Sequence, residues 1–358
     1  MLRKISALAI VCSSLFLTAK AQDSTSGSLK ISGYVDAYYR YNFNNAKDVA
    51  DPLNHNSRTS FTNSSNSFEL GMASLKAEYT KGKIGVVADL GFGTRAAEFS
   101  YVETANGQYL GSAIKQAYVT YAPSDKVKFT IGKWATHMGY ELVDPQLNRN
   151  YSMSHLFTYG PFTHTGLKAD FTLGSGFGLM VGVANPTDYV SAPFAKKNVI
   201  AQVSKTSDHL NAYLNYVGGK DLDDNSVNQI GLTLLAPVTS KFGLGLDAAY
   251  KTVDPSAAGS NISWWGTALY VNIDPSDKFG ITLRGEHFAD DDGLAGFGTG
   301  VTAGTLSFNI KPVPGIMIVP EFRLDGAGAA TYYKNSDAPG AASQKSTGSF
   351  ILAAVLSF

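Results

Sequence analysis

The chain of 358 residues carries 29 basic and 29 acidic side chains, and its single cysteine is Cys12. The balanced charge argues against a nucleic-acid binder, and one cysteine excludes both an internal disulfide and a metal site built on cysteines. Only 16% of the residues are charged whereas 12% are aromatic, which argues against a disordered chain.

The first 21 residues have the pattern of a cleavable export signal. Basic residues at positions 3 and 4 precede an apolar stretch over 5–17, and Ala19-Lys20-Ala21 places small residues at both positions that a signal peptidase reads. We therefore expect cleavage after Ala21, export, and a mature chain over 22–358. No later segment offers the ~18 consecutive apolar residues of a membrane helix, but a membrane-spanning strand needs only about 9–11 residues.

Residues 29–43 alternate between two kinds of side chain. One register consists of Leu29, Ile31, Gly33, Val35, Ala37, Tyr39, Tyr41 and Phe43, and the other of Lys30, Ser32, Tyr34, Asp36, Tyr38, Arg40 and Asn42. A period of two over this length predicts a strand with one apolar and one polar face.

The same alternation returns in six later segments, over 73–79, 84–95, 167–173, 242–251, 279–286 and 316–325. The charged residues of all seven segments fall in the polar register: Lys30, Asp36, Arg40, Lys76, Glu78, Asp89, Arg95, Lys168, Asp170, Asp247, Lys251, Arg284, Glu286, Glu321, Arg323 and Asp325. A lysine or arginine that faces lipid at mid-bilayer costs roughly 2–4 kcal/mol. We therefore expect the apolar faces to contact lipid and these charges to line a lumen.

The connections between strands alternate in length. Short turns fall at 80–83, 123–126, 174–176, 204–208, 236–241, 274–278 and 311–315, and long polar loops at 44–67, 96–112, 135–162, 186–197, 218–226, 253–262, 290–300 and 326–346. This layout predicts an all-β fold, a transmembrane antiparallel up-and-down β-barrel of about sixteen strands with short periplasmic turns and long extracellular loops. The weaker segments at 197–204 and 226–235 leave fourteen or eighteen strands as alternatives.

The chain ends on an alternating strand, with Phe350, Leu352, Ala354, Leu356 and Phe358 in one register. Such an ending resembles the signal read by the machinery that inserts barrels into the bacterial outer membrane. We therefore expect this machinery, outer-membrane lipid and lipopolysaccharide as partners, in a Gram-negative outer membrane. Resemblance to other sixteen-stranded outer-membrane barrels implies a possible homotrimer, although no strand shows an obvious protein-facing patch.

A barrel of about sixteen strands leaves an aqueous channel, whereas eight strands fill their lumen with side chains. Water in the lumen also removes the cost of burying so many charges. We therefore expect passive diffusion of small hydrophilic solutes. The equal numbers of positive and negative lumen charges give no reason to expect strong ion selectivity.

The longest connection, 135–162, is rich in aromatic residues and is expected to fold inward and narrow the lumen, with an extracellular lid as the alternative. The expected constriction residues are Lys133, His137, Tyr140, Glu141, Arg149 and Tyr151.

Several short motifs around this loop resemble one known family. They are Ile114-Lys115-Gln116-Ala117-Tyr118-Val119-Thr120-Tyr121, Gly132-Lys133, Gly139-Tyr140-Glu141, Asn150-Tyr151-Ser152, Gly160-Pro161-Phe162 and Gly166. In these motifs the chain resembles the OmpL-like β-barrel porins. The resemblance implies an outer-membrane porin with no cofactor and no known catalytic residues, and it implies no particular substrate.

Two other functions fit the same barrel. In the first, the barrel does not conduct, the loop 135–162 plugs the lumen, and the long loops bind a ligand or partner. In the second, less favoured one, the barrel is a hydrolase whose triad is drawn from His137, Glu141, Asp144, Ser152, Ser154 and His155. No spacing rule joins a nucleophile to a base among them, so we expect no enzyme.

Overall fold

The computed structural model describes residues 27–46, 56–257 and 259–358. The signal peptide expected over 1–21 lies outside these residues and stays a prediction. Within them the chain forms sixteen strands: β1 (Ser28–Asn42), β2 (Ser67–Lys81), β3 (Ile84–Phe92), β4 (Ile114–Ser124), β5 (Val127–Ala135), β6 (Thr163–Gly174), β7 (Phe177–Ala184), β8 (Asn198–Lys205), β9 (Asn211–Lys220), β10 (Ser226–Thr239), β11 (Phe242–Asp254), β12 (Ile262–Ser276), β13 (Phe279–Asp290), β14 (Thr299–Ile310), β15 (Ile316–Ala327) and β16 (Ser346–Ser357).

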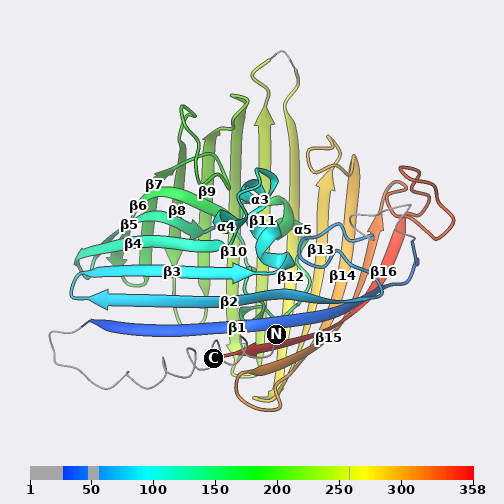
Figure 1. The fold of residues 1–358 in the computed structure, drawn as a ribbon, viewed down its shortest axis with the longest axis horizontal. Helices are drawn as coiled ribbons and strands as arrows, with labels where there is room; N and C mark the ends of the chain where they lie inside the picture. The colour runs from blue at the N-terminus through cyan, green and yellow to red at the C-terminus, as the bar shows by residue number, and fades with distance from the viewer. Residues whose placement is uncertain (1–26, 47–55, 258) are drawn as a thin grey trace, which may run out of the picture.

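The strands form one closed antiparallel barrel in which each strand pairs with its neighbours in sequence (Figure 1). The barrel closes where β1 pairs with β16, from Tyr34 opposite Ser357 to Asn42 opposite Ser349. The up-and-down barrel of sixteen strands is thereby confirmed, and the alternatives of fourteen and eighteen are wrong.

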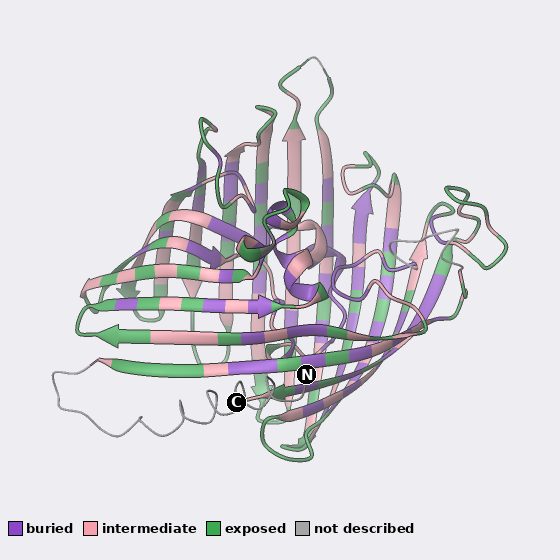
Figure 2. Ribbon diagram, in the orientation of Figure 1, coloured by how far each residue is buried: buried purple, intermediate pink, exposed green. Residues whose placement is uncertain are grey.

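The two faces of each strand differ as the alternation predicts. On β1, Leu29, Ile31 and Val35 are 60%, 56% and 45% exposed on the outer surface, whereas Asp36 and Arg40 in the other register are 0% and 3% exposed. The resulting bands of exposed and buried residues run along the strands of the wall (Figure 2). The apolar register therefore faces outward and the charged register faces the lumen.

Short turns and long loops alternate along the chain, so all short turns lie at one end of the barrel and all long loops at the other. The turn between β2 and β3 has only two residues, and Gly82 adopts a φ of +57° there, which favours glycine. By contrast, 27 residues separate β5 from β6, and this connection is the loop expected to enter the lumen.

Five short helical segments lie in the long loops: α2 (Thr94–Phe99), α3 (Tyr101–Ala105), α4 (Tyr109–Ser112), η1 (Pro145–Leu147) and α5 (His155–Tyr159). Figure 1 shows α3, α4 and α5 within the ring of strands. No helix in the described part of the chain is long and apolar enough to cross a membrane.

Arg95 was expected to continue the polar face of the strand that begins at Ile84, and this expectation is wrong. Strand β3 ends at Phe92, and Arg95 lies on α2. The chain turns at Gly93, whose φ is +129° and where an added Cβ would lie 2.5 Å from the carbonyl oxygen of Gly71. Glycine therefore ends the strand here and sends the helix inward.

Candidate functional site

The loop between β5 and β6, residues 136–162, crosses the lumen. Its two ends are held together where the backbone N–H of Thr136 donates to the carbonyl oxygen of Phe162 at 2.9 Å. At its start, the His137 Nε2–H donates to the carbonyl oxygen of Tyr216 on β9 at 3.1 Å, and Gln202 on β8 donates to the His137 carbonyl oxygen. Burial lowers the pKa of His137 to about 4, so the ring is neutral at neutral pH.

Tyr140, the next expected constriction residue, lies against β11 and β12. Its ring stacks on Tyr270 with centroids 4.0 Å apart, and its backbone N–H donates to Asp247 at 3.2 Å. The amide of Asn272 donates to its hydroxyl oxygen. Burial raises the pKa of Tyr140, so the hydroxyl keeps its proton.

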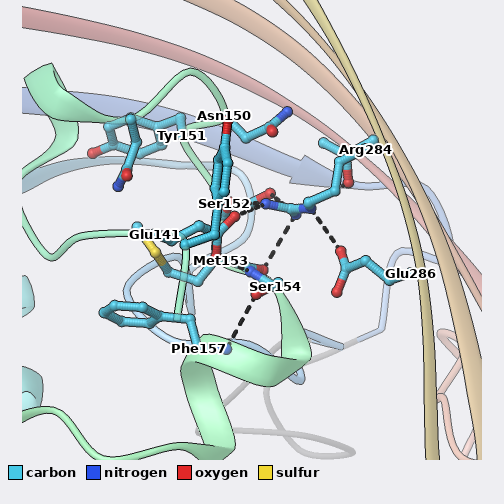
Figure 3. A network of polar contacts seen from close by, with 12 residues as sticks. Glu141, Asn150, Tyr151, Ser152, Met153, Ser154, Phe157, Arg284 and Glu286 are labelled. Atoms are coloured by element: carbon cyan, nitrogen blue, oxygen red, sulfur yellow. Dashed lines mark hydrogen bonds and ion pairs between the residues drawn. The ribbon is translucent and has the colours of Figure 1, made fainter. Parts of the chain in front are cut away.

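Arg284 on β13 is the centre of a buried ionic network that fixes the middle of the loop (Figure 3). Its guanidinium lies 2.5 Å from Glu141 of the loop and 2.7 Å from Glu286 of its own strand, and it donates to the Ser152 carbonyl oxygen at 2.7 Å. The second oxygen of Glu141 accepts from the backbone N–H of Ser154 at 2.7 Å. Charges expected on the lumen wall thus bind the loop instead of standing free in water.

Tyr151 binds the loop to the wall near the seam of the barrel, where β1 meets β16. Its hydroxyl donates to Asp36 of β1 at 2.5 Å, and its backbone N–H donates to Glu321 of β15 at 2.7 Å. The Arg95 guanidinium lies 4.8 Å from the centroid of the Tyr151 ring and 3.8 Å from Asp36. The carboxylate of Asp36 is therefore balanced by Arg95.

The remaining two expected constriction residues contact different parts of the barrel. Arg149 makes a bidentate ion pair with Asp274 on β12, at 3.0 and 2.7 Å. Lys133 is on β5 and not in the loop itself, and its ammonium lies 3.7 Å from Glu103 on α3. Arg149 thus anchors the loop near the short-turn end, whereas Lys133 anchors the neighbouring loop.

Three long loops share a small apolar core inside the lumen. Phe61 of the first loop, Phe99 of α2, and Phe157 and Phe162 of the 136–162 loop belong to one buried cluster with Met72 of β2. Phe99 and Phe162 stack with centroids 5.7 Å apart. Because apolar burial is added to the ionic contacts, the loops are fixed to one another as well as to the wall.

The lumen charges divide into two sets by exposure. On β13 and β15, the side chains of Arg284, Glu286 and Arg323 are 0%, 2% and 5% exposed. On β5 and β6, those of Lys128 and Asp170 are 53% and 31% exposed. Lys168, Lys76, Glu78 and Lys251 are likewise only half-buried, whereas Asp89, Asp247 and Glu321 are buried. Buried charges also lie on β3, β5 and β11, at Asp89, Lys133 and Asp247, so the loops bury charges on both sides of the lumen.

A cavity of about 530 Å³ opens at the long-loop end. Its floor and walls come from β9, β10 and β11, from the end of the 136–162 loop, and from the connection between β7 and β8. Asp188 of that connection accepts the backbone N–H groups of Phe162 and Thr163 at 2.8 and 2.7 Å. Burial nevertheless raises the pKa of Asp188 to about 6.

Sequence reasoning missed several residues of this site. Lys115 on β4 is buried and lies 3.2 Å from Asp89 and 2.5 Å from Asp144. By spacing, Lys115 falls with Ala117 and Val119 in the apolar register, and it faces inward only because the pairing of β3 and β4 shifts register between Asp89 and Leu90. Alternation therefore could not have identified it. Asp188 lies in an irregular loop, where no periodic signal marks it.

The residues considered for a hydrolase are engaged in other contacts. His155 lies 3.1 Å from Glu286 through Nδ1, Ser154 accepts the Phe157 N–H as the N-cap of α5, and Ser152 accepts from Arg284. No serine–histidine hydrogen bond occurs among these six residues in the described structure. The same part of the chain contains no group of three or more His, Cys, Asp or Glu residues that could hold a metal ion.

Known proteins resemble the chain in sequence pattern and in fold. The sequence model of the family described as "Putative beta-barrel porin-2, OmpL-like" matches residues 28–358. No curated protein matches the chain.

Several solved structures share the architecture. The anion-selective porin from Comamonas acidovorans has a TM-score of 0.63 at 11% identity, over 93% of this chain and 100% of its own. The outer membrane channel DcaP of Acinetobacter baumannii has a TM-score of 0.64 at 15% identity, over 95% and 100%. The trimer form of OmpT from Vibrio cholerae has a TM-score of 0.61 at 12% identity, over 93% and 100%. At these identities the likeness concerns the fold alone.

Proposed function

Because the chain belongs to the family of OmpL-like β-barrel porins, we propose that small hydrophilic solutes and ions diffuse passively through its lumen. The protein is an outer-membrane porin, and it has the closed sixteen-stranded barrel of this class. The route and the kind of solute are the parts that we propose.

The half-exposed charges of β5 and β6 carry this proposal. Lys128 and Asp170 face the lumen with side chains 53% and 31% exposed, and their nitrogen and oxygen are 3.8 Å apart. An unhydrated lumen would impose a desolvation penalty of several kcal/mol on each such ion. Their exposure supports water at this part of the lumen wall, and we propose that the 136–162 loop narrows the lumen and that the six expected residues, five of the loop and Lys133 of β5, set the constriction.

Single-channel recording of the refolded protein in a planar bilayer tests the proposal. We expect discrete openings, because the proposed hydrated route passes the partly exposed charges Lys128 and Asp170. A well-folded barrel that never conducts would contradict it. A salt gradient in the same recording measures ion preference, and the balanced lumen charge predicts a reversal potential near zero.

One observation supports the alternative, in which the loop plugs the barrel. The 136–162 loop contacts β1, β4, β8, β9 and β11 to β15, which is most of the circumference. Replacing residues 139–160 by a short glycine–serine linker separates the two cases. A narrowing loop predicts larger openings in the variant than in the intact protein, whereas a plug predicts openings in the variant alone.

We also propose how the chain reaches and occupies the membrane. The signal over residues 1–21 directs export, the strand ending in Phe358 is read by the insertion machinery, and lipid and lipopolysaccharide surround the barrel. OmpT of Vibrio cholerae was solved in a trimer form, and this supports a homotrimer here as well.

A further inference from the structure

The cavity at the long-loop end, hereafter the vestibule, contains two polar side chains that no neighbour uses. The vestibule is defined by Tyr159, Phe162, Asp188, Lys220, Gln229 and Lys251. Gln229 on β10 lies directly opposite Lys251 on β11 in the strand register, so the two side chains project side by side into it. In the described part of the chain neither side chain makes a hydrogen bond or an ion pair.

Other lysines around the lumen differ from Lys251 in having partners. Lys115 is paired with Asp89, Lys168 lies 3.6 Å from Asp170, and Lys220 donates to Ser226 at 2.9 Å. A lysine ammonium has three donors and no acceptor, so it favours an oxygen-rich partner wherever it is withdrawn from water. Lys251 is therefore available to a solute.

The acidic groups of the vestibule are occupied by the protein itself. Asp188 accepts two backbone N–H groups and, through its other oxygen, the Tyr101 hydroxyl at 3.2 Å. Asp221 accepts two backbone N–H groups of its own turn, and Glu98 accepts the Phe61 N–H at 2.8 Å. Each of these carboxylates is engaged by hydrogen-bond donors of the protein, and none lies within ion-pair distance of the Lys251 ammonium.

The wall beside Lys251 is aromatic. Tyr159 and Phe162 line the vestibule, and Phe162 is held in place by a stacked contact with Phe99 and an edge contact with Tyr101. The volume of about 530 Å³ falls in the range of about 300–1,000 Å³ that is typical of sites for small organic molecules. A cavity with one apolar wall and a few converging polar groups is the usual form of such a site.

We propose that the vestibule binds small organic anions before they pass the loop. The ammonium of Lys251 and the side-chain amide of Gln229 hold the oxyanion, and the apolar or ring-shaped body of the solute lies against Tyr159 and Phe162. This inference rests on the proposed porin function and names the class of solute that the porin prefers.

Equilibrium binding to the detergent-solubilised protein tests the site without requiring conductance. The probes are benzoate, its neutral analogue benzamide, and acetate, which lacks a ring. We expect benzoate to bind at least tenfold more tightly than either, and Lys251→Met to weaken benzoate binding at least tenfold. Lys334→Met, at an exposed lysine of the last long loop, is the matched control and should leave benzoate binding unchanged.

Gln229→Leu provides a second variant whose charge is unaltered, and it should weaken benzoate binding severalfold. Circular dichroism and heat-dependent gel mobility verify that each variant is folded. The proposal is overturned if the folded protein does not bind benzoate, if neither vestibule variant weakens binding, or if acetate or benzamide binds as tightly as benzoate.

The bilayer recording then separates this inference from the proposed function. Benzoate on one side should reduce the open-channel current of the intact protein more than that of Lys251→Met. A barrel that binds benzoate through Lys251 but never conducts would overturn the porin proposal and keep the site. A barrel that conducts without binding benzoate would overturn the site and keep the porin.

Discussion

Single residues inside the lumen show that a charge predicted to face water on the barrel wall can instead bind the 136–162 loop. Arg284 and Glu286 follow the polar register of their strand, so sequence alone places them on the lumen side. In the loop, Arg284 contacts Glu141 and Ser152, and Glu286 contacts His155. These partners lie more than 130 positions away, and no local pattern connects them. Alternation thus predicts which side a residue faces, whereas the contacts it makes there depend on the path of the loop.

Breaking the central ion pair should destabilise the protein strongly. In Glu141→Gln, Arg284 keeps Glu286 but loses one of its two carboxylate partners, and a buried charge that loses a partner costs about 3–5 kcal/mol. Denaturant unfolding of the refolded barrel measures this loss. Lys196→Met, which breaks the exposed pair with Asp224, is the control and should leave the unfolding midpoint unchanged. Equal midpoints for the two variants would contradict the anchoring role.

Acid should loosen the start of the loop through His137. Its pKa is about 4 in the folded protein, below the ordinary value of 6.5, so between these values the proton binds only after the ring leaves its burial. The contribution of His137 is therefore fully present above pH 6.5 and is lost as the pH falls toward 4. The groups facing the ring include Lys168, Asp170 and His164.

Hydrogen exchange of residues 136–162 at pH 7.5 and pH 5 measures this effect. We expect lower protection factors, which are corrected for the slower intrinsic exchange in acid, at pH 5 in the intact protein and a smaller pH effect in His137→Gln, which cannot be protonated at this position. An equal fall in protection in both proteins would assign the effect to other groups.

Single elements were predicted unevenly. The strands and turns are marked by local patterns of two to fifteen residues. Their number and order could therefore be predicted from the sequence. The helices α2 to α5 carry no such pattern, because each has six residues or fewer and is held by contacts with the wall and with other loops. Arg95 was misplaced for the same reason: a polar residue at the expected spacing does not reveal that its strand has ended.

Gly93 offers a test at this scale, because it sets the direction of α2. In Gly93→Ala the new Cβ would meet the Gly71 carbonyl oxygen at 2.5 Å in a backbone conformation that favours glycine. We expect a loss of about 1–3 kcal/mol in the free energy of unfolding, read from denaturant titration. Gly304→Ala on β14 has open space around its Cβ and should change the value little. Similar losses in both variants would contradict the strained turn.

In the whole molecule, the barrel wall is regular, whereas the loop contacts inside the lumen are irregular. The wall could be predicted almost completely, because lipid on one side and water on the other impose the same alternation on every strand. The interior could not, because its contacts depend on the path of the 136–162 loop. That loop buries charges of β11, β13 and β15, whereas Lys128 and Asp170 on β5 and β6 stay partly exposed.

The seam between β1 and β16 also has a consequence for the order of events in folding. Tyr34 pairs with Ser357, and the backbone N–H and carbonyl oxygen of Phe358 form hydrogen bonds with Gly33 at 3.0 and 3.1 Å. Strand β1 therefore gains its second neighbour only when β16 is in place. Before closure, the free edge of β1 and that of the last strand formed expose unpaired backbone N–H and C=O groups that could pair with another strand. The barrel can therefore close only after β16 has been synthesised, although β1 comes first in the chain.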